Sequence, residues 1–195
     1  MLNIKRKNWL SIQEWLSQRL QLVSQQKTVK PALNLNDLVF KLATANDISE
    51  ILPKVLVALQ QMVNEPFTHT EHGDLLVLFS NSLTSESFLH HSLEVAPAPK
   101  LIQALHQHFT MRRTSEKSII NLQINAAAFT LVPIRLFEHD NQTVWLLMMF
   151  RQSVPDEKKL KWEMAVIEQT LSKGLQAWFQ RESKVKQALA AERAI

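Results

Sequence analysis

The stretch "FTLVPIRLFEHDNQTVWLLMMF", residues 129 to 150, contains two apolar runs on either side of a polar segment. Residues 129–137 and 143–150 are rich in β-branched, aromatic and other apolar side chains, which favour β-strands. The polar segment between them centres on Asp140 and Asn141, residue types that are typical of tight turns. The stretch therefore predicts an antiparallel hairpin.

Other parts of the chain predict further strands of the same sheet. Residues 74–80, "DLLVLFS", form a short continuous apolar run, which is typical of a strand covered on both faces. Residues 119–126 alternate between apolar and polar side chains, as in a strand with one buried face. A further strand is expected within 87–95, "SFLHHSLEV".

Helical patterns surround these strands. Apolar residues at spacings of three and four predict helices over 3–30, 35–45, 46–63 and 99–109, and a long helix from about 156 to the end of the chain. Asp47 is suited to cap the third of these. The order of elements indicates an α+β fold, with one antiparallel sheet and helices packed on one side of it.

The first and last helices carry apolar stripes that suit contact with a second helix. In the first helix the stripe is narrow and includes Leu16 and Leu20. A narrow stripe of this kind favours a partner helix, from this chain or from another. The last helix has a broad apolar face up to Trp178, and its stripe then thins to Val185 and Leu189 among charged residues. We therefore expect its first half to pack on a domain and its second half to project.

The composition excludes several classes of site. The 195-residue chain has no cysteine, which removes disulfides, thiolate nucleophiles and cysteine-based metal sites. Its two glycines are too few for a phosphate-binding loop of the P-loop or Rossmann type. The net charge of +4 comes from short basic clusters interspersed with acids, which is typical of solvated helix faces and argues against nucleic-acid binding. No apolar run is long enough to span a membrane, and no secretory signal is visible.

Two local clusters could form a binding site. His69, Glu71 and His72 in "HTEH" have side chains that can hold a metal, but they lie in an expected surface loop without obvious further ligands, so we predict no metal. Arg112 and Arg113 could grip a carboxylate, a phosphate or nitrate, although an arginine pair in a loop also suits a solvated turn. No cofactor is indicated.

The segment from the hairpin into the last helix resembles the closing half of a GAF domain. Residues that carry the likeness are Pro133–Ile134, the turn near Asn141, the strand to Phe150, the acidic pair Asp156–Glu157, and the helix through Gly174. The segment 35–63 resembles the opening helices of that family, and the likeness covers roughly residues 35 to 180. It implies a GAF-like sheet with helices.

The end of the chain, "ALAAERAI", resembles the segment before the phosphoacceptor box of nitrate/nitrite-type sensor histidine kinases. Gly174–Leu175 also resemble that family, some of whose members carry a central cysteine cluster that this chain lacks. The likeness implies a helix that continues into a kinase core. It implies an N-terminal signalling helix (1–33), a GAF-like domain (34–180) and an outgoing linker helix (181–195).

The resemblance implies a non-catalytic, cytoplasmic relay module of a two-component sensor whose parent protein is anchored in the inner membrane. A homodimer is expected, and the kinase core of the parent chain is the expected partner. The dimer contact is expected at Leu16, Leu20, Leu171, Gly174, Leu175, Trp178, Val185 and Leu189. Two alternatives are a free-standing GAF-like receptor for a small molecule, using Arg112 or Arg113, and a self-contained adaptor.

Overall fold

A computed structural model describes residues 33–81, 83–84, 86–111, 119–124 and 126–193. The chain divides into two units between Leu35 and Asn36, and the fold below belongs to the second unit. The helices are α2 (Leu35–Thr44), α3 (Ile48–Asn64), α4 (Pro99–Met111) and α5 (Glu157–Arg193), with a 3₁₀ turn, η1, at His69–Glu71. The strands are β1 (Gly73–Asn81), β2 (Ser87–His91), β3 (Ile120–Ile124), β4 (Ala127–His139) and β5 (Gln142–Phe150). The predicted helix over 3–30 lies outside the described residues.

The strands form one antiparallel sheet in the order β2-β1-β5-β4-β3. The hairpin predicted from residues 129–150 is confirmed as β4 and β5. Its two turn residues, Asp140 and Asn141, have φ angles of 47° and 63°. Positive φ at both central positions matches the right-handed twist of the flanking strands, and Asp and Asn tolerate it better than most residues.

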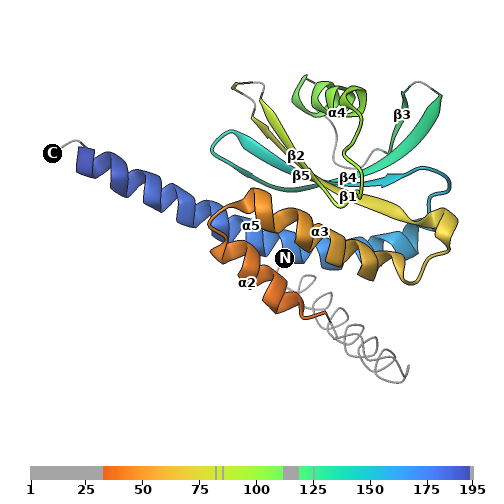
Figure 1. The fold of residues 1–195 in the computed structure, drawn as a ribbon, viewed down its shortest axis with the longest axis horizontal. Helices are drawn as coiled ribbons and strands as arrows, with labels where there is room; N and C mark the ends of the chain where they lie inside the picture. The colour runs from red at the N-terminus through yellow and green to blue at the C-terminus, as the bar shows by residue number, and fades with distance from the viewer. Residues whose placement is uncertain (1–32, 82, 85, 112–118, 125, 194–195) are drawn as a thin grey trace, which may run out of the picture. The chain divides into compact units, whose positions relative to one another are not determined.

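Helices cover both faces of this sheet (Figure 1). On one face, α4 places Leu101, Leu105 and Phe109 in a cluster with buried residues of β1 and β5. On the other face lie α3 and α5 (Figure 1), which contact β1 and β4 respectively. The α+β class is therefore confirmed, but the expectation that all helices pack on one side is wrong, because the apolar stripe of α4 faces the opposite side of the sheet.

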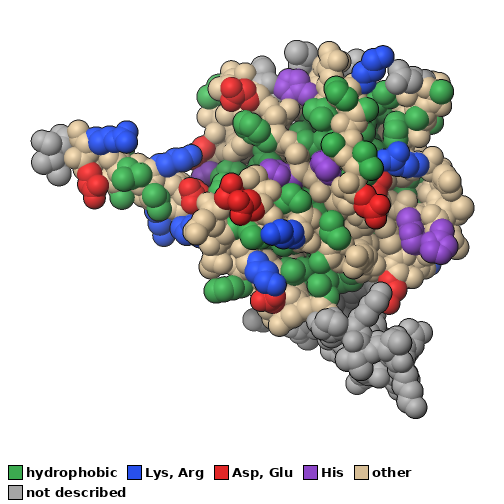
Figure 2. All heavy atoms as spheres, viewed as in Figure 1, with side chains coloured by type: hydrophobic (Ala, Val, Ile, Leu, Met, Phe, Trp, Pro, Cys, Tyr) green, Lys and Arg blue, Asp and Glu red, His purple; other side chains and the backbone are tan. Residues whose placement is uncertain are grey.

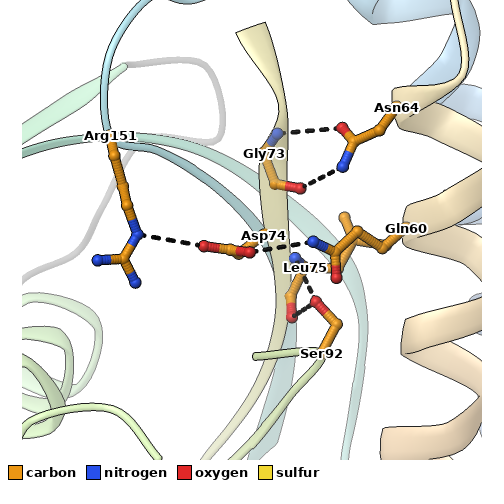
Figure 3. Close-up of polar contacts among 7 residues, drawn as sticks. All are labelled: Gln60, Asn64, Gly73, Asp74, Leu75, Ser92 and Arg151. Carbon is orange, nitrogen blue, oxygen red and sulfur yellow. Dashed lines mark hydrogen bonds and ion pairs between the residues drawn. The ribbon is translucent and has the colours of Figure 1, made fainter. Parts of the chain in front are cut away.

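Polar side chains fix the start of β1 to α3 (Figure 3). The buried amide of Asn64 accepts a hydrogen bond from Gly73 N and donates one to Gly73 O, both at 3.0 Å. Next along the strand, Asp74 accepts from Gln60 Nε2 at 3.0 Å and faces Arg151 Nε at 3.5 Å. Because buried backbone groups must be paired, Asn64 acts as a local substitute for a neighbouring strand.

The helix α3 begins as the sequence predicts. Asp47 is its N-cap, and its carboxylate accepts a hydrogen bond from Ser49 N at 2.8 Å. Hydrogen bonds from the Ser49 side chain and backbone lower the pKa of Asp47.

Among the described residues, none of the helices combines the length and the apolar composition of a membrane span.

Candidate functional site

The end of α2 is held by two side chains of α5. Trp178 Nε1 donates a hydrogen bond to Ala45 O at 3.0 Å, and Arg181 Nη1 donates one to Ala43 O, also at 3.0 Å. Arg181 Nη2 also donates to Ala45 O. We call Trp178, Arg181 and these two carbonyls the α2–α5 clamp. The last carbonyls of a helix lack intrahelical partners and carry partial negative charge, so the guanidinium both pairs with them and neutralises them.

Gly174, one turn before Trp178, lies where α5 closely approaches α2. A Cβ atom at this position would lie 2.7 Å from Leu42 Cβ and 3.3 Å from Val39 O. Glycine inside a helix lowers stability by about 1 kcal/mol relative to alanine. Its presence here is explained by the close contact with α2, which leaves no room for a side chain. Leu42, Leu171 and Leu175 are fully buried around it.

This packing corrects part of the predicted dimer interface. Leu171, Gly174 and Leu175 are buried inside the fold, so no second chain can cover them in this arrangement. The reason is that the apolar stripe of α5 is used by α2 and the sheet of its own chain. Leu16 and Leu20, the predicted contacts on the first helix, lie outside the described residues.

The C-terminal turns of α5 carry the rest of the predicted interface. From Lys184 to Arg193 every residue is exposed, and α5 continues past the sheet (Figure 1). Val185 and Leu189 are 48% and 49% exposed. They lie four residues apart and therefore on one face of the helix. Figure 2 shows apolar side chains among charged ones on this part of α5.

Aromatic rings fix α5 to the sheet beside the clamp. The ring centroid of Phe179 lies 5.9 Å from that of Phe79, 5.6 Å from that of Phe137 and 5.8 Å from that of His139. Aromatic pairs at such separations add to the stabilisation that burial alone gives. The helix is therefore held from two sides at residues 178–181, by the sheet and by α2, and it is exposed from Lys184 onward.

A second candidate site lies between the sheet and α4. Trp145 of β5 is 5% exposed, and its ring centroid lies 5.1 Å from that of Phe109 of α4. The Nε1 atom of Trp145 is buried and finds no hydrogen-bond partner among the described residues, and the same holds for Nδ1 of His91 on β2. Both residues face α4, because they share a sheet face with Leu78 and Leu76, their cross-strand neighbours. The indole N–H of Trp145 can only donate, and a buried donor without a partner is costly, so it points to a missing acceptor. Nδ1 of His91 donates or accepts according to the tautomer of the ring.

The two clusters noted in the sequence have separate outcomes. Arg112 and Arg113 lie outside the described residues. In "HTEH", Glu71 caps the η1 turn by accepting hydrogen bonds from Thr68 N and Thr68 Oγ1, which also lower its pKa. In the described part of the chain, no three His, Asp or Glu side chains are placed to hold a metal.

Sequence reasoning missed Arg181 and the unpaired atoms of Trp145 and His91. A charged residue on an amphipathic helix usually indicates a solvated face, and nothing in the sequence shows that Arg181 reaches the end of α2.

Comparison with protein-family models finds no match for this chain. Comparison with curated proteins finds no match either.

Proposed function

We propose that the chain is a cytoplasmic, non-catalytic relay module of GAF-like type from a two-component sensor histidine kinase. In this proposal α2 receives the input, and α5 passes it to the kinase core of the parent protein. The observation that carries the proposal is the α2–α5 clamp, in which the end of the incoming helix is bonded directly to the helix that leaves the domain.

The geometry suits transmission for a physical reason. The clamp and Gly174 join α2 to α5 over two successive turns, so a displacement of α2 cannot occur there without moving α5 or breaking hydrogen bonds. Packed elements of this kind have discrete arrangements and do not deform continuously. An input that favours one arrangement would therefore shift the population of the outgoing helix.

In the proposed homodimer, Val185 and Leu189 of two chains pack against each other beyond the domain. Two exposed apolar residues at helical spacing form the start of a seam between parallel helices. Lys184 and Lys186 flank this stripe and remain exposed. The N-terminal helix expected over residues 1–33 would extend the interface.

The double variant Val185→Glu/Leu189→Glu tests the proposed interface. Because it places four like charges in the seam of a dimer, we expect it to weaken self-association by at least about tenfold, an effect of about 1.4 kcal/mol. Sedimentation velocity over a range of concentrations measures this. The control Gln187→Glu/Ala191→Glu adds the same charges on the opposite side of α5 and should leave self-association unchanged. Equal weakening by both variants would contradict the proposed interface.

The kinase part of the proposal has its own test. The gene beyond the codon for Ile195 should encode a phosphoacceptor histidine at the start of the dimerisation helices. A stop codon directly after Ile195 would refute the relay to a kinase and leave a free-standing receptor or adaptor.

A second candidate function is that of a small-molecule receptor, and the unpaired Trp145 Nε1 and His91 Nδ1 favour it. The side chains around them are mostly apolar, including Leu89, Leu93 and Phe109. The ligand class that suits this environment has an apolar body and a carbonyl or carboxylate oxygen that accepts from the indole N–H.

Aromatic carboxylates and amides are suitable probes for the receptor function. A probe present at a hundred times its Kd should stabilise the chain by about 2.7 kcal/mol. We expect Trp145→Phe, which removes only the indole donor and part of the ring, to weaken binding by about tenfold. Differential scanning fluorimetry measures both effects, with Trp162→Phe, an exposed tryptophan of α5, as the control. Equal binding by the Trp145→Phe variant would exclude the indole as the donor.

A further inference from the structure

Within the part of the chain that the structure describes, β2 lies at one edge of the sheet and pairs with β1 alone. At its two ends, Glu86 O accepts from Asn81 N and Ser92 N donates to Leu75 O, both at 2.9 Å. Since hydrogen-bonding direction alternates along an antiparallel strand, the backbone groups of Phe88 and His90 also point toward β1. The N–H and C=O groups of Ser87, Leu89 and His91 therefore point outward, at the free edge.

The strand β2 lacks three of the features that usually prevent strands from pairing between chains. Natural edge strands are protected by lysine, proline, bulges or a covering element. The sequence of β2, "SFLHH", has no lysine and no proline. Its register with β1 is continuous from Ser87 to His91. Phe88 is 60% exposed although its neighbour across the ladder, Phe79, is buried.

We propose that β2 pairs antiparallel with β2 of a second copy of this chain, about a two-fold axis at Leu89. In this register Ser87 faces His91 of the other copy, and Leu89 faces its own counterpart. The three pairs, with two hydrogen bonds each, would use all six outward groups of each strand's three residues. Moving the axis by one residue, to Phe88 or His90, would leave the two outward groups of one residue without a partner inside the strand. The register about Leu89 is therefore the one that pairs all of them.

The side chains support the same register. Phe88 would face His90 of the other copy, in a pair whose side chains lie close together. Within one chain, His90 already packs edge-on against Phe79, with ring centroids 5.4 Å apart. Burial lowers the pKa of His90 below its usual value, the adjacent His91 lowers it further and Asp47 opposes both, so the ring is neutral at neutral pH. Glu86 would face Ser92, so no like charges oppose each other between residues 86 and 92.

A pairing of five-residue strands buries less area than a stable complex requires, so this contact should be weak and dependent on concentration. It uses a different surface from Val185 and Leu189, and it does not rest on the proposed relay function. A second copy of the chain is favoured as the partner over an unrelated strand. A second β2 pairs all the outward backbone groups and at the same time places a side chain against the exposed Phe88.

Disulfide trapping tests the proposal directly, because the chain has no cysteine of its own. Residues 88 and 90 of opposite copies would have Cα atoms about 4.5 Å apart, within the range that a disulfide can bridge. An oxidised mixture of Phe88→Cys and tagged His90→Cys chains should give the mixed dimer at least about ten times faster than either variant alone. Phe40→Cys, at another exposed site, gives the background rate for random collision.

Mixed dimers no faster than the Phe40→Cys background would overturn the proposal. Phe88→Cys homodimers that form faster than the mixed dimer would overturn the proposed register about Leu89. Because a cysteine at position 90 could disturb folding, Phe88→Lys gives a second test in the Val185→Glu/Leu189→Glu background, where helical pairing is weakened. There we expect Phe88→Lys to weaken the remaining concentration-dependent self-association further in sedimentation. Self-association equal to that of the Val185→Glu/Leu189→Glu parent would contradict pairing through β2.

Discussion

Replacing Gly174 with leucine should lower the free energy of unfolding by about 3 kcal/mol, at the upper end of the usual cost of overpacking. The first atom of the new side chain would already lie 2.7 Å from Leu42 Cβ and 2.8 Å from Leu42 Cδ1. Cβ of Leu42 is attached to the α2 backbone and cannot rotate away, so α2 must move. Urea denaturation followed by circular dichroism measures the change in midpoint at constant slope.

Gln176→Leu is the matched control for this prediction. It introduces the same side chain into the same helix at an exposed position, and surface changes of this kind stay within about 0.5 kcal/mol. Combining Gly174→Leu with Leu42→Ala should cost less than the sum of the two single changes, because the truncated side chain makes room for the new one. Additive costs would show that α2 does not pack against Gly174 in solution.

Much of the sheet could be predicted from local sequence patterns. The alternation over 119–126 correctly placed Ile120, Leu122 and Ile124 on one face, where they join the cluster under α4. The turn at Asp140 and Asn141 was predictable because few residue types tolerate positive φ. These features depend on neighbours in the chain, so the sequence contains them directly.

Features that depend on contacts between distant segments could not be predicted in the same way. The apolar stripe of α5 indicates that Leu171 and Leu175 are buried, but it does not show whether a second chain or the same chain covers them. The stripe of α4 likewise does not say which sheet face it covers. Arg181 bonds to carbonyls about 137 residues earlier in the chain, and backbone carbonyls leave no mark in a sequence. The candidate site was therefore the least predictable part of the molecule.

The α2–α5 clamp should behave as one unit in a double-mutant cycle. We expect Trp178→Phe to cost about 1 kcal/mol and Arg181→Met about 2 kcal/mol, the usual values for neutral and charged hydrogen bonds. Ala45 O accepts from both side chains, so either single variant leaves this carbonyl with one partner. The double variant leaves it with none and should cost about 4 kcal/mol, more than the sum of the two. Urea denaturation measures all three variants.

Hydrogen exchange then distinguishes a clamp from general destabilisation. The Ala45 N–H donates to Leu42 O at 3.3 Å. Its exchange should be faster in the double variant than in the wild type, whereas the exchange of β5 amides should change less, because only the end of α2 is released. Lys184→Met, an exposed change on the same helix, should leave both exchange and stability unchanged. Arg181→Lys should be intermediate, because an ammonium group lacks the planar fork that reaches two carbonyls at once. If the two single costs simply add, Trp178 and Arg181 act independently, and α2 can then move without a coordinated response from α5. In that case the proposed route from input to output would lose its physical basis.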